Sequence, residues 1–179
     1  MVQLPEPAES SSYFTIADVG KERIRRVIAR MQEENEDRQL SLGLHPDQDL
    51  GFKVFKLAPS TFRQWEPPEE EGAETLGEQL SLFDRGLAED ADPRHVIYEV
   101  ILKLGYSLNA AIEPLELESN RVFKVIGDRT FYICLDDELD NATLDALPLD
   151  KETTFVCLDT ALDDSQKVNL AMHCLLKVI

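Results

Sequence analysis

Residues 92–105 carry the helix signal that most constrains how this chain can fold. Asp92 has the short acceptor side chain that caps helix N-termini, and Pro93 suits the first helical turn, where its missing N–H costs no hydrogen bond. Gly105 marks the end of the helix. Between these signals the apolar residues recur at helical spacing, at Ile97, Val100, Ile101 and Leu104. The pattern predicts a helix with one buried face, onto which the following residues pack.

Three β-type runs follow this helix, at residues 112–117, 121–126 and 129–135. The last two runs meet at Gly127 and Asp128. Glycine readily adopts the positive φ that the first central position of a type II′ turn requires. The pair therefore predicts a tight β-hairpin.

Four carboxylates lie within the five residues after the third run, at Asp136, Asp137, Glu138 and Asp140. Such a cluster at a strand end can hold Mg²⁺ or Ca²⁺, although the spaced oxygens and glycine of a calcium loop are missing. The alternative is that these acids precede a short helix through Leu144 and Leu147, with Asn141 or Thr143 as its N-cap.

The C-terminal residues continue the alternation of helix and strand patterns. A fourth β-type run covers residues 153–158, and a final helix is expected over 165–179. Its inner face is expected to consist of Val168, Ala171, Met172 and Leu175. The order over residues 93–179 is therefore α-β-β-β-α-β-α, which indicates the α/β class, with α+β as the alternative.

The N-terminal region reads as a strand, a helix and a second strand. Residues 2–4 resemble the end of a buried strand that begins before the chain does, and Thr15 with Asp18 resembles a capping box. The helix that follows fades near Glu34, residues 35–50 read as a loop, and residues 52–57 read as a strand.

The N-terminal helix pattern also carries the one cationic cluster of the sequence, formed by Lys21, Arg23, Arg25, Arg26 and Arg30. One interpretation is a solvated face whose charges pair with neighbouring glutamates. The other is a contact with DNA phosphates or with a partner protein. Because 18 Lys and Arg stand against 35 Asp and Glu, the net charge of −17 opposes non-specific nucleic-acid binding. Any DNA contact is expected to be local and weak.

An acidic segment divides the chain. Residues 66–92 contain 10 Asp or Glu and only Arg85 in opposition. Leu76, Leu80 and Phe83 predict a short amphipathic helix within it. Trp65, just before, is either a base-stacking platform or an anchor at the edge of a core. The expected division is residues 1–66, a linker at 67–92 and a C-terminal domain at 93–179.

The cysteines and the hydropathy indicate a soluble, cytoplasmic protein. Cys134, Cys157 and Cys174 all lie in apolar runs, as buried reduced thiols do. No apolar stretch is long enough to span a membrane, and no secretory leader follows Met1. Sequence motifs of nucleases, hydrolases and phosphate-binding loops are also absent.

Three segments together resemble the C-terminal part of the modification subunit of type III restriction-modification systems, which are DNA adenine-N6 methyltransferases. They are residues 2–7 with 15–26, residues 51–57 with Ser60, Phe62 and Trp65, and residues 101–137. The resemblance implies that residues 1–66 are part of a Rossmann-like domain that binds S-adenosylmethionine. It also implies that Gln3 and Glu6 belong to the cofactor site.

The sequence departs from that family in two respects. The Asp/Asn-Pro-Pro-Tyr tetrapeptide and the Phe-x-Gly-x-Gly loop are both absent, and Gln3 stands where an acid usually accepts the ribose hydroxyls. We therefore expect a fragment that binds no S-adenosylmethionine and transfers no methyl group alone. Expected partners are the rest of the methyltransferase, a restriction subunit and a second copy in a homodimer. The alternative is a stand-alone acidic module that binds a protein partner.

Overall fold

The computed structural model describes residues 4–9, 12–42, 49–63, 86–88, 90–117 and 119–179, with only the backbone described for residues 35–42. The chain divides into two compact units, residues 1–55 and residues 56–179. The three-part division at 66/67 and 92/93 stays a prediction. Trp65 and the predicted short helix at residues 76–83 lie outside the described residues.

The first unit consists mainly of one long helix, α1 (Ile16–Leu42). The predicted capping box is confirmed, because the Thr15 N–H donates to Asp18 Oδ2 at 3.0 Å and the Asp18 N–H donates to Thr15 Oγ1 at 3.2 Å. The predicted end near Glu34 is wrong, and so is the loop assigned to residues 35–42. That stretch loses the apolar periodicity but contains neither Gly nor Pro, so nothing in it stops a helix.

The strand predicted at residues 52–57 is also wrong. These residues form no β-ladder, and Val54 and Leu57 are 53% and 105% exposed. Phe, Val and Ile favour extended backbone, but a strand exists only where a second strand pairs with it. Of the predicted strand at residues 2–4, only Leu4 is described; it is exposed and lies outside any strand.

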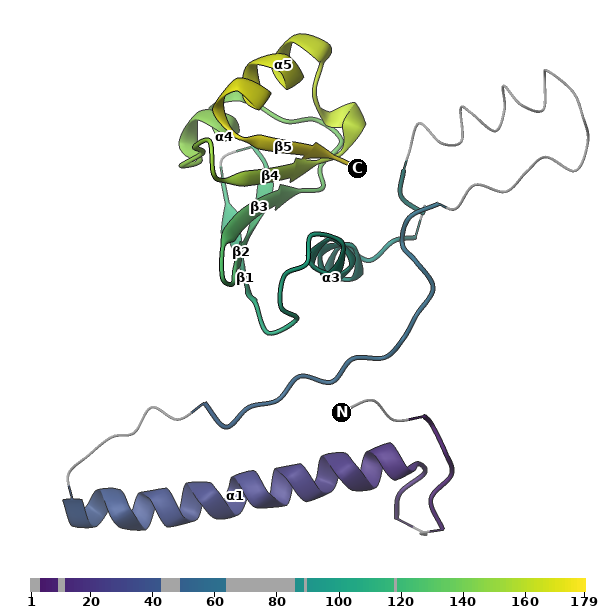
Figure 1. Ribbon diagram of the computed structural model, residues 1–179, viewed down its shortest axis with the longest axis vertical. Coiled ribbons are helices and arrows are strands. Elements are labelled where there is room, and N and C mark those ends of the chain that lie inside the picture. Colours follow the sequence, from purple (N-terminus) through teal and green to yellow (C-terminus); the bar gives the residue numbers. More distant parts are fainter. Residues whose placement is uncertain (1–3, 10–11, 43–48, 64–85, 89, 118) are drawn as a thin grey trace, which may run out of the picture. The chain divides into compact units, whose positions relative to one another are not determined.

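The second unit is built on a mixed five-stranded sheet in the order β1-β2-β3-β4-β5 (Figure 1). The strands are β1 (Ala111–Glu116), β2 (Arg121–Ile126), β3 (Thr130–Cys134), β4 (Thr154–Cys157) and β5 (Leu175–Val178). The pairs β1–β2 and β2–β3 are antiparallel, whereas β3–β4 and β4–β5 are parallel. The α/β character predicted for this region is therefore confirmed.

Helices cover both faces of this sheet. On one face, α3 (Pro93–Lys103) packs on alternate strand residues that include Val125, Phe131 and Val156. On the other face, the elements that follow β3 and β4 cover the intervening strand residues. These elements are α4 (Asn141–Ala146), the short 3-10 helix η1 (Asp159–Ala161) and α5 (Asp164–His173). Figure 1 shows α3 on the side of the sheet opposite α4 and α5.

The central helix forms as the sequence predicts. Asp92 Oδ1 accepts a hydrogen bond from the Arg94 N–H at 2.8 Å, and Gly105 has a φ of 76° directly after the helix. Ile97 and Ile101 are fully buried. The apolar face is displaced slightly from the predicted one, because Val96 is also buried whereas Leu104 is only half-buried.

Two local predictions in the second unit are wrong, one for the β2–β3 hairpin and one for the start of α4. Ile126 pairs with Thr130, so the hairpin loop has three residues, and Gly105 is the one described glycine with positive φ. Gly127 therefore adopts no type II′ turn; its N–H donates to the Arg129 carbonyl at 3.1 Å. The N-cap of α4 is Asp140, which accepts from the Ala142 N–H, rather than Asn141 or Thr143.

The final helix predicted over residues 165–179 is wrong in its second half. The helix α5 ends at His173, and β5 then pairs with β4. The predicted inner face is exposed, with Val168 at 63% and Met172 at 68%, whereas Leu170 is buried. The end of the chain is apolar enough for either structure, and pairing along the open edge of β4 decides in favour of a strand.

Residues near 60 and near 87 pack together within the second unit. The Ala88 N–H donates to the Thr61 carbonyl at 2.9 Å, and Phe62 and Leu87 form an isolated antiparallel bridge. Both side chains are partly buried and pack against the core on the α3 face. In the part of the chain that the structure describes, no helix is long and apolar enough to cross a membrane.

Candidate functional site

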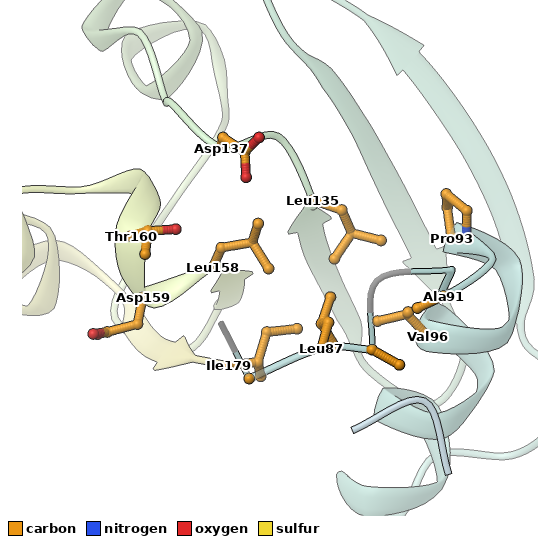
Figure 2. Close-up of a pocket in the computed structure, with 12 residues that line it drawn as sticks. Leu87, Ala91, Pro93, Val96, Leu135, Asp137, Leu158, Asp159, Thr160 and Ile179 are labelled. Atoms are coloured by element: carbon orange, nitrogen blue, oxygen red, sulfur yellow. The ribbon is translucent and has the colours of Figure 1, made fainter. Parts of the chain in front are cut away.

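A cleft of about 490 Å³ lies at the carboxyl ends of the three parallel strands (Figure 2). Leu135, Leu158 and Ile179 line it, and each directly follows the last residue of β3, β4 or β5. In open α/β sheets, ligands bind outside the carboxyl ends of the strands. The position and size of the cleft therefore make it the candidate site of the second unit.

One wall of the cleft is apolar. Pro93 and Val96 contribute from the start of α3, and Leu87 and Ala91 contribute from the segment before it. Figure 2 shows these side chains together on one side, with Leu135 and Leu158 between them and the opposite wall. This wall exists because the first turn of α3 lies beside the strand ends.

The opposite wall is polar and acidic, and it carries Asp137, Asp159 and Thr160. Lys167 of α5 pairs with Asp159, with 2.8 Å between Nζ and Oδ1. The hydrogen bond to Asp159 raises the pKa of Lys167. Asp137 has no hydrogen bond or ion pair to any residue that the structure describes. It is therefore the carboxylate that the cleft offers to a ligand.

The neighbouring acids serve the fold instead. Asn120 is buried and donates from Nδ2 to Asp136 Oδ2 at 2.9 Å, and its Oδ1 accepts from the Asp140 N–H at 3.0 Å. Asp140 also caps α4. Among the described residues, no three His, Cys, Asp or Glu side chains come together in a way that could hold a metal ion.

The cysteines take no part in the cleft. All three are buried and unpaired with one another, in the core on the α4 and α5 face. Burial raises the pKa of Cys134 to about 11 and that of Cys157 to about 12. Thiols with such pKa values are not nucleophiles at neutral pH. The cleft therefore offers a ligand an apolar wall and the Asp137 carboxylate, and no reactive thiol among its described residues.

The site residues predicted in the first unit are placed as follows. Gln3 lies outside the described residues, and Glu6 is exposed. Three members of the cationic cluster on α1 form ion pairs within the helix: Lys21 with Asp18 at 2.6 Å, Arg26 with Glu22 at 2.9 Å and Arg30 with Glu34 at 2.9 Å. Pairs of this kind are what the solvated-face interpretation predicts. Arg23 and Arg25 are exposed. Their contact with DNA or a partner stays a prediction.

Sequence reasoning did not find the cleft. The sequence pattern marks Asp137 only as a member of an acidic cluster, and it predicts strands at Leu135 and Leu158 and a helix at Ile179. The signal that could have found them is their position just after successive buried β-type runs, combined with parallel pairing. No family model, no curated protein and no solved structure matches this chain.

Proposed function

We propose that this chain forms the C-terminal, non-catalytic portion of a type III DNA adenine-N6 methyltransferase and that it serves the assembly of that enzyme. The family is supported by the resemblance of three segments to the modification subunit, which are residues 2–7 with 15–26, residues 51–57 with Ser60, Phe62 and Trp65, and residues 101–137. In this proposal Gln3 and Glu6 lie near the cofactor, and S-adenosylmethionine binds only when the rest of the enzyme is present.

The observation that carries the assembly role is the lack of a core in the first unit. None of its described side chains, at residues 4–9, 12–34 and 49–55, is buried. Ile24 and Val27 on α1 are 41% and 57% exposed, and Val54 is 53% exposed. Because exposed apolar area costs about 25 cal/mol per Å², these surfaces favour packing on a further surface, which in this proposal is the rest of the methyltransferase.

Reconstitution tests this proposal. The chain is co-expressed with the region of a type III modification subunit that carries the two missing motifs, and methyl transfer from labelled S-adenosylmethionine to duplex DNA is measured. We expect transfer only when both polypeptides are present. The chain alone is expected to show no S-adenosylmethionine binding in calorimetry.

A pair of α1 variants makes this experiment specific. Val27→Asp places a charge on the exposed apolar face and is expected to lower the reconstituted activity at least about tenfold, the effect of losing about 1.4 kcal/mol of association energy. Gln32→Asp adds the same charge at an exposed polar position and is expected to have no effect. Equal activity of both variants, or no rescue by the wild-type chain, would contradict the assembly role.

A second candidate function is a stand-alone acidic module that binds a protein partner. The observation that favours it is the second unit, which has a core on each face of its sheet and its own cleft. If the reconstitution fails but the second unit captures a partner, this reading replaces the first. In both readings the homodimer stays a prediction, which light scattering on the full chain can check.

A further inference from the structure

We propose that the cleft at the ends of β3, β4 and β5 is a docking site for a basic, apolar segment of a partner protein. In this arrangement a Lys or Arg side chain of the segment binds Asp137, and an adjacent apolar side chain enters between Leu135, Leu158 and Ile179. The proposal concerns the second unit alone and does not rest on a methyltransferase origin.

The charges around the cleft select a cation. Among the described residues that line it, the charged side chains are the carboxylates of Asp137 and Asp159, with no Lys or Arg. Lys167 already neutralises Asp159 from outside the lining, so Asp137 is the acid left for a ligand. The net charge of −17 on the whole chain adds an attractive field for cations and a repulsive one for phosphates and other anions. A nucleotide or nucleic-acid ligand is therefore disfavoured.

The apolar lining selects against a purely polar cation. Four apolar side chains around the cleft are half-buried: Leu87, Leu135, Leu158 and Ile179. Leu158 packs against the core on the α4 and α5 face, and the other three pack against the core on the α3 face. A hydrated polyamine would leave these side chains in contact with water. A segment that carries both an aliphatic and a basic side chain removes this apolar area from water and neutralises Asp137 at the same time.

The size of the cleft fits a few side chains. Its volume of about 490 Å³ lies in the usual range of binding sites. The wall formed by Leu87, Ala91 and Val96 lies opposite the wall of Asp137 and Thr160, as Figure 2 shows. An extended segment can therefore place side chains of different character on the two walls.

Methyl NMR on the full chain tests the proposal. The probe is the acetylated and amidated hexapeptide Leu-Lys-Leu-Arg-Leu-Lys, titrated into chain labelled at its Ile, Leu and Val methyl groups. We expect saturable shifts confined to the methyl-bearing residues of the lining, which are Leu87, Val96, Leu135, Leu158 and Ile179. The affinity is expected to fall as salt increases, because one ion pair contributes to it.

Two variants and their controls define the site. Asp137→Asn is expected to weaken peptide binding by up to about fivefold, the value of one partly exposed ion pair, whereas Asp145→Asn on the exposed surface of α4 should leave it unchanged. Thr160→Trp fills the cleft from an exposed position and is expected to abolish binding, whereas Thr160→Ser should preserve it.

Three results would overturn the proposal. They are methyl shifts spread over the molecule, equal binding of the matched peptide Leu-Glu-Leu-Glu-Leu-Glu, and displacement of the basic peptide by equimolar spermine. The last result would mean that charge alone is recognised. If Thr160→Trp does not fold, as judged from its methyl spectrum, the comparison of Asp137→Asn with Asp145→Asn still decides. Methyl transfer in the reconstituted enzyme is a separate readout, so the two proposals fail independently.

Discussion

Glu99 of α3 holds residues 60 and 61 in place through both of its carboxylate oxygens. It accepts hydrogen bonds from Ser60 Oγ at 2.5 Å and from the Thr61 N–H and Oγ1, each at 2.7 Å. Lys103 lies 3.3 Å from the same carboxylate and 3.2 Å from the centre of the Phe62 ring. This single acid therefore fixes the segment that carries Phe62 onto α3.

Glu99→Gln is expected to destabilise the chain by about 2 kcal/mol at pH 7, because charge-assisted hydrogen bonds are lost. Burial raises the pKa of Glu99, but the hydrogen bonds from Ser60 and Thr61 outweigh it and lower the pKa from 4.5 to about 2. The extra stability of the wild type is therefore complete above about pH 4.5 and is lost as the pH falls toward 2. Urea unfolding of both proteins at pH 7 and pH 3 measures the difference in their free energies of unfolding, which should be smaller at pH 3.

The control for this prediction is Glu152→Gln, in an exposed turn. It is expected to change the free energy of unfolding by less than about 0.5 kcal/mol at either pH. If Glu99→Gln behaves like this control, the contacts to Ser60 and Thr61 contribute nothing to stability.

Asn120→Asp is expected to cost about 3 kcal/mol at pH 7, because it leaves a buried group unpaired and brings two carboxylates together. The Asn120 Nδ2 donates to Asp136 Oδ2 at 2.9 Å and to the Glu138 carbonyl at 2.8 Å, and a carboxylate can make neither bond. Below about pH 4 a protonated carboxyl can donate again, so the cost should shrink. Thermal unfolding measures the effect, and Asn169→Asp on the exposed face of α5 is the neutral control.

At the scale of elements, prediction succeeded where the signal is local. The helix α3 has its cap, its proline and its stop within a few residues, and β2 was predicted with its observed ends. Prediction failed where a distant partner decides. Residues 52–57 have strong strand propensity but no ladder, whereas residues 175–178 become a strand because β4 offers an edge.

The cleft could not be predicted for the same reason. It requires that Leu135, Leu158 and Ile179, which are far apart in sequence, meet at one edge of the sheet. That meeting depends on the parallel pairing of β3, β4 and β5. The sequence pattern predicts a helix over residues 165–179 in place of β5. The position of Ile179 at the end of a strand therefore could not be predicted.

The two turn glycines of the second unit are expected to respond differently to alanine. Gly105 has a φ of 76° and open space where a Cβ would be, so Gly105→Ala should cost about 1 kcal/mol through backbone strain alone. Gly127 lacks positive φ, and its Cβ would make an ordinary contact of 3.5 Å with Tyr106, so Gly127→Ala should be nearly neutral. Urea unfolding of the two variants compares them, and equal losses would contradict the assignment of strain to Gly105, the residue after the C-cap of α3.

At the scale of the whole molecule, the cores of the chain lie in the second unit. One core joins α3 to the sheet and the other joins α4 and α5 to it, and every buried apolar residue in the described part of the chain belongs to one of them. Phe62 and Leu87, which precede α3, are partly buried and pack against the first of these cores. The structural unit that carries the cleft therefore begins before residue 93.

This start point leads to a prediction about truncation. A polypeptide of residues 56–179 is expected to unfold in one cooperative transition and to be more stable than residues 93–179 by about 3 kcal/mol. The shorter form loses the packing of Phe62 and Leu87 on α3 and the hydrogen bonds to Glu99. It also loses Leu87 from the wall of the cleft. Urea unfolding of the two forms measures the difference in stability. Glu99→Gln in the polypeptide of residues 56–179 should reproduce part of that loss of stability. Equal stability would mean that residues 60–63 and 86–88 contribute nothing, and that the domain begins at residue 93 as the sequence alone predicts.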